Sequence, residues 1–304
     1  MNSNSQPDSS TNLPDSNRLS IVGIGASAGG LAALKTFFTK VPKDSGLAFV
    51  VVVHLNPRED SHLAELLVKY VSMPIKQVTE TVAIEPNRIY VIPPNANLDT
   101  IDTHLRLSKL EEERKNRAPI DHFFRTLAAM HPHNAIGVIL TGVGSDGTLG
   151  VREIKGNGGM VIVQDPVEAE FDGMPQNAIA TGSVDLVLPI DQIPDAILRF
   201  TQTTPRVVVP QEEPIPDSPD INTNKRQLLH KIFTHIRAQT GRDFSLYKPS
   251  TIMRRISRRM QLHHTEELFA YLELLRQQPQ EARSLADDLL ITVTNFFRDP
   301  AIFE

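Results

Sequence analysis

The chain contains no cysteine, which excludes disulfide bonds, thiolate metal sites and cysteine nucleophiles. The same absence means that cysteine usage gives no guide to the redox compartment. Long apolar runs are also missing, because the longest one, near Ala48–Val53, is far below the roughly 18 residues of a membrane span. The first 18 residues are polar and lack the apolar core of a secretory signal. We therefore expect a cytoplasmic protein without direct membrane insertion.

The composition is that of a soluble globular protein with about two domains, since 40% of the 304 residues are hydrophobic and the formal charge is −5. Residues 1–18 are too polar to bury a core, so we expect them to be disordered. A folded unit is expected over 19–203, followed by a stiff linker over 204–224 that contains five prolines. From residue 225 to 304 the apolar pattern is helical, and we find no internal repeat.

Buried strands and helices alternate in the first unit. Short apolar runs typical of strands occur at 20–25, 47–54, 88–92, 135–140, 160–163 and 185–188. Helical spacing occurs at 31–38, 61–70, 120–130 and from 151. The alternation predicts an α/β fold with a doubly wound, mostly parallel sheet and flanking helices, followed by a small all-α domain.

Three polar residues follow three of these strands. Ser27 lies in the small-residue stretch "IVGIGASAGG", His54 ends "VVVH", and Asp146 lies in the glycine loop "TGVGSDG". If neighbouring strands carry them, all three meet at the carboxyl edge of the sheet, where ligands bind. Serine, histidine and aspartate are the residues that acyl transfer needs. Amides at the start of the following helix, beginning with Ala28, would then face a developing oxyanion.

Other interpretations of these residues remain open at this point. A serine in a glycine-rich turn can simply be a small residue that fits, and Asp146 can shape its loop through an Asx turn. The pattern "GIGASA" matches a loose dinucleotide-binding motif, but a histidine and an asparagine stand where that fold places an acidic residue. A phosphate-loop enzyme is disfavoured because no G-K-S/T follows. A non-catalytic signalling scaffold is a further alternative.

Five blocks in order make the first unit resemble the catalytic domain of the CheB family of chemotaxis protein-glutamate methylesterases. They are "IVGIGASAGGLAAL", "VVVHLNP", "APIDHFFRTLA", "VILTGVGSDGTLGV" and "VQDPVEAEFDGMPQNAIATGSVDLVLP". The resemblance implies that Ser27 is the nucleophile, His54 the base and Asp146 the orienting acid. It also implies that the amide of Val143, where the family usually has methionine, helps to hold the oxyanion. Family members commonly have a receiver domain in front, where this chain has only about 18 polar residues, so receiver control in cis is not expected.

The second unit resembles the N-terminal helical domain of the CheR family of glutamate methyltransferases, through "GRDFSLYKPSTIMRRISRRM" and "LLITVTNFFRDPAIF". The resemblance implies that Thr294, Phe296, Phe297 and Arg298 belong to a methyl-donor site. The S-adenosylmethionine domain of that family would follow Glu304, so we expect no transferase activity from this chain and no S-adenosylmethionine without that domain.

A basic stripe marks the second unit. Arg254, Arg255, Arg258 and Arg259 recur at spacings of one and four within "MRRISRRM". Between Lys225 and Arg276 there are eleven basic and four acidic residues, a local balance of +7. The stripe can be a solvated face, and no aromatic interleaving supports nucleic acid. The resemblance implies a third use, docking on the acidic methylation helices of a chemoreceptor.

The resemblance to the CheB family implies a hydrolase of γ-glutamyl methyl esters on methyl-accepting chemoreceptors or similar methylated signalling proteins. Deamidation of receptor glutamines is a further expected activity. The esterase reaction requires neither a metal nor an organic cofactor, and nucleic acid is not an expected partner.

Overall fold

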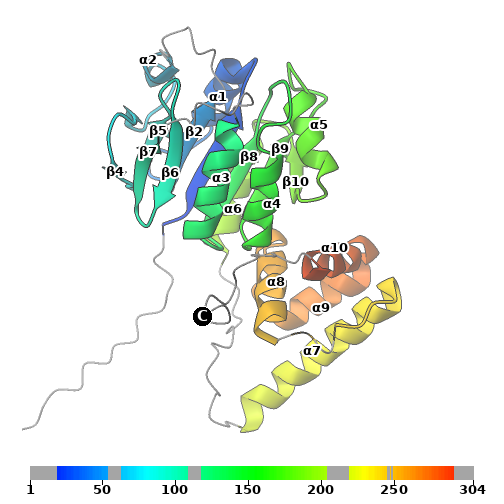
Figure 1. The fold of residues 1–304 in the computed structure, drawn as a ribbon. Coiled ribbons are helices and arrows are strands. Elements are labelled where there is room, and N and C mark those ends of the chain that lie inside the picture. Colours follow the sequence, from blue (N-terminus) through cyan, green and yellow to red (C-terminus); the bar gives the residue numbers. More distant parts are fainter. Residues whose placement is uncertain are drawn as a thin grey trace, which may run out of the picture.

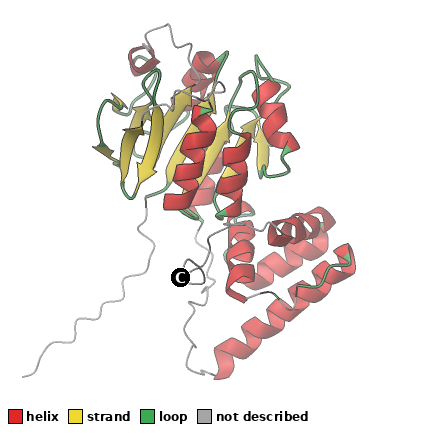
Figure 2. Cartoon of the chain, in the orientation of Figure 1, coloured by secondary structure: helices red, strands yellow, loops and turns green. Residues whose placement is uncertain are grey.

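The computed structural model describes residues 19–53, 63–108, 118–203, 219–244, 247 and 249–290. Two bodies are visible, an α/β domain and below it a cluster of helices (Figure 1). The helix, strand and loop pattern of Figure 2 shows that all strands belong to the first body. The predicted fold class, a doubly wound parallel sheet followed by a helical region, is confirmed.

A seven-stranded sheet forms the centre of the α/β domain, and every pairing within it is parallel. From one edge to the other the strands are β10 (Leu186–Leu188), β9 (Met160–Gln164), β8 (Ala135–Ile139), β1 (Ile21–Ala26), β2 (Ala48–Val53), β5 (Arg88–Val91) and β3 (Ile75–Gln77). The central strands are buried along their whole length, as the continuous apolar runs require.

Helices cover both faces of this sheet. One hydrophobic core joins it to α1 (Gly30–Thr39), α2 (Leu63–Val68) and α6 (Ile193–Gln202). A second core joins the opposite face to α3 (Pro119–Met130), α4 (Thr148–Gly156) and α5 (Gly173–Ala180). A small antiparallel sheet of β4 (Val82–Ala83), β7 (His104–Ser108) and β6 (Asn97–Ile101) extends this second layer.

The order of the strands reverses at β1. From β1 the chain passes through α1 to β2 on one side, whereas β8 lies on the other side and leads through α4 to β9. Because the two connections leave on opposite faces, their loops separate above the carboxyl ends of β1 and β8. Such a switch point is where open α/β sheets bind ligands.

The helical domain has its own core, built from α7 (Pro219–Thr240), α8 (Pro249–Leu262), α9 (Leu268–Gln277) and α10 (Pro279–Leu290). Helix α7 begins at Pro219, inside the segment 204–224 that the prolines predict as linker. Proline is compatible with the first turn of a helix, where its missing N–H has no partner to lose. None of the helices in the described part of the chain combines the length and apolar character needed to cross a membrane.

Candidate functional site

Ser27 lies at a sharp bend between β1 and α1. Its N–H donates to the carbonyl oxygen of Thr141 at 3.1 Å, and its own carbonyl oxygen accepts the N–H of Gly30 at 2.9 Å. Gly29 is in the left-handed region with φ of 75°, and a Cβ there would lie 2.7 Å from a carboxylate oxygen of Glu170. The small residues around Ser27 are therefore required by the turn and by its close neighbours.

Thr141 anchors this bend from the end of β8. Its buried hydroxyl oxygen lies 3.2 Å from the carbonyl oxygens of both Ala28 and Phe171 and accepts the N–H of Phe171 at 2.8 Å. Its N–H donates to the side chain of Gln164 at 2.8 Å. The serine bend, the loop after β8 and the loop after β9 are thus tied together by one buried side chain.

Gly142 brings the loop after β8 against the nucleophile candidate. Its carbonyl oxygen accepts the N–H of Met174 at 2.8 Å, and its N–H donates to Phe171. Met174 is the second residue of α5 and lies in the block "VQDPVEAEFDGMPQNAIATGSVDLVLP", in which the sequence analysis proposed no site residue. Farther along the loop, the carbonyl oxygen of Gly144 accepts a side-chain N–H of Asn177, a residue of α5, at 2.8 Å. These contacts fix the loop that carries Asp146.

We predict that Gly142→Ala disrupts the site. A Cβ at this position would lie 2.2 Å from the sulfur of Met174 and 2.9 Å from the Cβ of Ser27. The bend must shift, at a cost of about 1–3 kcal/mol in the free energy of unfolding, and the turnover of any ester substrate should fall more than tenfold. Gly173→Ala is the matched control, because its nearest contact would be 3.4 Å. Equal tolerance of both changes, measured by thermal unfolding and turnover, would contradict this packing.

Asp146 lies in the same loop, four residues after Gly142. Its carboxylate accepts the N–H of Ile120 at 3.1 Å and that of Asp121 at 2.9 Å, at the start of α3. Each carboxylate oxygen has two acceptor sites, so these bonds leave capacity for a further donor. Burial raises the pKa of Asp146 to about 6, against the lowering effect of the two N–H groups. Asp146 therefore caps the start of α3, and the pKa of the same carboxylate is raised.

The three strands that lead to the expected triad are neighbours, with β1 between β2 and β8. The last residues of β1 and β2, Ala26 and Val53, are register partners, and Ser27 and His54 follow them in the chain. His54 itself lies outside the described residues, as do Thr294, Phe296, Phe297 and Arg298. Their predicted roles remain predictions.

The two oxyanion candidates lie on either side of the switch point. Ala28 follows Ser27 in the bend, with its carbonyl oxygen near the Thr141 hydroxyl. Val143 stands between two glycines in the loop after β8, and its side chain is 57% exposed. Both residues lie in the loops that follow the carboxyl ends of β1 and β8. Their use as N–H donors to an oxyanion stays a prediction.

An open cleft of about 430 Å³ lies beside Ser27. Its walls are mostly apolar and come from the bend, α1, the end of β2 and the start of α2, and its lining is Ser27, Gly29, Gly30, Leu31, Ala32, Lys35, Val53 and Leu63. Lys35 is the charged residue of that lining, and its ammonium lies 4.3 Å from the ring centre of Tyr70. Among the residues that the structure describes, no three His, Asp or Glu side chains are grouped to bind a metal ion.

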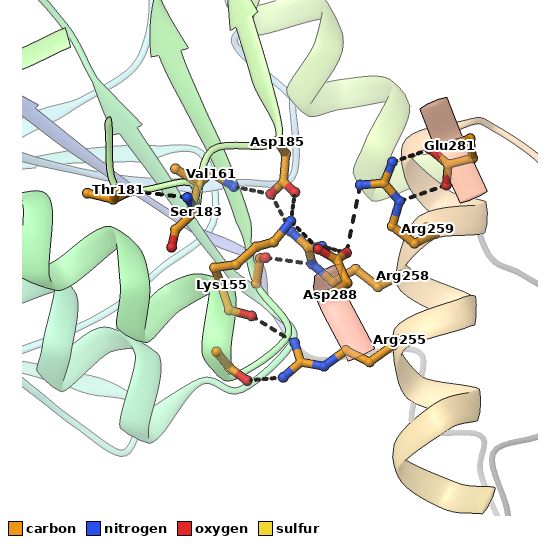
Figure 3. Close-up of polar contacts among 12 residues, drawn as sticks. Lys155, Val161, Thr181, Ser183, Asp185, Arg255, Arg258, Arg259, Glu281 and Asp288 are labelled. Atoms are coloured by element: carbon orange, nitrogen blue, oxygen red, sulfur yellow. Dashed lines mark hydrogen bonds and ion pairs between the residues drawn. The ribbon is translucent and has the colours of Figure 1, made fainter. Parts of the chain in front are cut away.

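The arginine stripe is not a free surface in this structure. Arg255, Arg258 and Arg259 are 8%, 2% and 7% exposed, respectively, whereas Arg254 is exposed. The three buried side chains of α8 face the α/β domain and the acidic residues of α10 (Figure 3). The interpretation of the stripe as a solvated face is therefore wrong for these three arginines, and the docking of the stripe on a chemoreceptor stays a prediction. Their partners Glu281 and Asp288 lie beyond the segment over which the local charge was counted, and Asp185 lies in the other domain.

Comparison with known proteins agrees with this architecture. Residues 22–197 match the CheB methylesterase family, and residues 227–290 match the CheR methyltransferase all-alpha domain. The crystal structure of the Thermotoga maritima CheB methylesterase catalytic domain superposes with a TM-score of 0.55 at 31% identity, covering 60% of this chain and 98% of that one.

Two relatives illustrate how similar this sequence is to those of known proteins. A Leptospira interrogans protein, provisionally named protein-glutamate methylesterase/protein-glutamine glutaminase, is 40% identical over 59% of this chain and 93% of its own length. An uncharacterized Rhodobacter capsulatus protein is 35% identical over 79% of this chain, which spans only 27% of that relative. The chain thus belongs to the CheB methylesterase family and carries, after its esterase domain, an all-alpha domain of the CheR type.

Proposed function

We propose that the chain hydrolyses γ-glutamyl methyl esters on a methylated signalling protein of the chemoreceptor kind, with Ser27, His54 and Asp146 as a catalytic triad. The observation that carries the proposal is the position of Ser27, on a tight bend at the switch point, beside the loop that holds Asp146. Membership of a methylesterase family supports the same chemistry. Deamidation of glutamine side chains would use the same groups.

In the first step, the imidazole of His54 takes the hydroxyl proton of Ser27, and Ser27 Oγ bonds to the ester carbonyl carbon. The carbonyl oxygen becomes an oxyanion, for which the amides of Ala28 and Val143 are the proposed donors. The carbon–oxygen bond to the methoxy group then breaks, His54 returns the proton to that oxygen, and methanol leaves. The product is a glutamyl ester of Ser27.

In the second step, water attacks the same carbonyl carbon while His54 takes one of its protons. The bond to Ser27 Oγ breaks, the serine regains a proton from His54, and a glutamate carboxylate is released. Asp146 holds the imidazole in the useful tautomer and stabilises its positive form in both steps. For a glutamine substrate, ammonia replaces methanol as the leaving group of the first step.

The cleft matches a short, uncharged ester better than a free carboxylate. Its apolar walls of Leu31, Val53 and Leu63 surround Ser27 and favour the methylated side chain over the hydrated product anion. Lys35, which belongs to the same lining, provides a positive charge that would attract an acidic segment of the substrate protein.

We predict that ester turnover falls on the acid side with an apparent pKa near 6. The pKa of Asp146 is raised to about 6, so its carboxylate becomes protonated as the pH falls through this value and no longer stabilises the imidazolium. Protonation of the proposed histidine base would lower the rate in the same direction, because only a neutral imidazole accepts a proton. A pH–rate profile from pH 4.5 to 8 checks this, and a rate that stays flat down to pH 4.5 would contradict it.

The proposed function is tested by incubating the chain with a chemoreceptor cytoplasmic segment that carries methylated glutamates, and measuring methanol release. We expect catalytic release in proportion to enzyme, and ammonia release from a segment that carries glutamines instead. Release that does not exceed the buffer rate for either substrate would favour the scaffold alternative.

A further inference from the structure

The arginine face of α8 contacts a defined edge of the α/β domain. Arg255 donates to the carbonyl oxygens of Lys155 at 2.9 Å and Gly156 at 2.7 Å, and Arg258 Nε donates to that of Gly159 at 2.8 Å. Lys155 and Gly156 are the last residues of α4, whose C-terminal carbonyl groups lack helical partners and attract cations. The guanidinium groups thus complete a helix end that belongs to the other domain.

Four buried charges form an alternating cluster across the same contact (Figure 3). The α/β domain contributes Lys155 and Asp185, and the helical domain contributes Arg258 and Asp288. Lys155 Nζ lies 2.7 Å from Asp288, and Arg258 Nη1 lies 3.0 Å from Asp288. Asp185 pairs with both cations and accepts the N–H of Val161 at 2.8 Å. Each domain supplies one positive and one negative group, so the cluster is neutral as a whole and within each half.

The surrounding residues support this arrangement from the helical side. Arg259 pairs with Glu281, which also accepts the hydroxyl of Tyr271 at 2.7 Å and lies 2.6 Å from His263. Although burial alone would raise them, the adjacent cations lower the pKa values of Asp185 and Glu281 to about 2. Both carboxylates therefore stay charged at neutral pH.

The contact lies at the amino ends of the strands. Gly159 directly precedes β9, Asp185 directly precedes β10, and α4 ends there. The other end of α4 begins after Asp146 and Gly147, at the candidate site. Its nine residues separate the two regions by about 14 Å at 1.5 Å per residue. In Figure 1 helices α7 to α10 accordingly lie below the sheet, at the opposite end from the carboxyl ends of its strands.

We infer that the arginine face of α8 is an intramolecular docking surface, which holds the helical domain on the amino-end edge of the esterase sheet without help from the linker. While docked, Arg255, Arg258 and Arg259 are not available to an acidic partner, and the Ser27 edge remains uncovered by this domain. The inference rests on the contact alone and does not depend on the proposed esterase activity.

The test uses the full chain with a protease recognition site inserted within residues 204–218, which join the domains. After cleavage, we expect the two fragments to elute together in size-exclusion chromatography at micromolar concentration, in 0.15 M and also in 0.5 M salt, because buried pairs are screened little. Arg258→Ala should weaken the association on the order of tenfold or more, since it leaves Asp185 and Asp288 short of a cation.

Two further variants keep the outcome interpretable. Lys155→Met/Asp185→Asn removes the two charges that the α/β domain contributes to the cluster. The helical domain keeps its own sequence in this variant, so separation of its fragments would not reflect misfolded helices. Arg254→Ala, on the exposed side of the same helix, should leave the fragments together. Separation of the unmutated fragments, co-elution of the Lys155→Met/Asp185→Asn fragments to the same extent as the unmutated ones, or equal effects of Arg254→Ala and Arg258→Ala would overturn the inference.

Discussion

Ser27→Ala should reduce methyl ester turnover by at least a factor on the order of 10³, because the proposed acyl bond forms on the hydroxyl oxygen that this change removes. The hydroxyl is at the bend between β1 and α1, where the backbone bonds to Thr141 and Gly30 involve only main-chain atoms. Alanine preserves those bonds, so thermal stability should change by less than about 1 kcal/mol. The loss would therefore be chemical and not the result of unfolding.

Ser145→Ala is the matched control for this experiment. Ser145 is an exposed serine in the loop after β8 and directly precedes Asp146. Its substitution should leave turnover within about twofold of the unmutated chain. If Ser27→Ala retained more than a tenth of the rate, or Ser145→Ala lost as much, the assignment of the nucleophile would be wrong.

Asp146→Asn should lower turnover by a factor on the order of 10³ to 10⁴, because an amide favours the wrong imidazole tautomer and does not stabilise the imidazolium. The same side chain accepts two N–H groups at the start of α3. Asparagine keeps one oxygen as an acceptor and loses the other, so we also expect about 1–2 kcal/mol of destabilisation. Turnover and chemical denaturation, measured on the same protein, separate the two effects.

Asp121→Asn provides the comparison. Asp121 is also buried, and its carboxylate accepts the N–H of Gly150 at 2.8 Å between α3 and α4. Its substitution should destabilise the domain to a similar extent but alter turnover only a few-fold. If the two variants lost stability and turnover in parallel, Asp146 would be a loop and helix-capping residue only, which is the alternative that its sequence context leaves open.

Much of the α/β domain could be predicted because its signals are local. Continuous apolar runs identified β1, β2, β5, β8, β9 and β10, and all six lie in the parallel sheet. The short strands β3 and β4 and the hairpin of β6 and β7 were not predicted, since alternating, partly exposed residues such as those of Asn97–Ile101 give a weak signal. Helices α5 and α6 were also missed.

The residues that hold the loops of the candidate site in place were harder to predict from the sequence than its polar residues. Ser27 and Asp146 stand out because each follows a strand in a glycine-rich segment. Thr141 and Met174 look like ordinary residues, and their importance arises from contacts between the loops after β8 and β9. Such contacts between distant segments have no periodic signature in the sequence.

The basic stripe shows a different limit. Spacings of one and four place arginines on a helix face, but they do not tell whether water or another domain covers that face. The carboxylate of Asp185 is 73 positions away from Arg258 in the sequence. A local charge count therefore indicated an exposed surface where the fold forms a buried contact.

The central claim, that Ser27 is an activated nucleophile, is tested most directly by mass spectrometry after reaction with a fluorophosphonate probe. We expect one probe adduct per chain, on the peptide that contains Ser27, and its disappearance in both Ser27→Ala and His54→Ala. A chain that gains no adduct, or an adduct that maps to another serine such as Ser145, would contradict the claim.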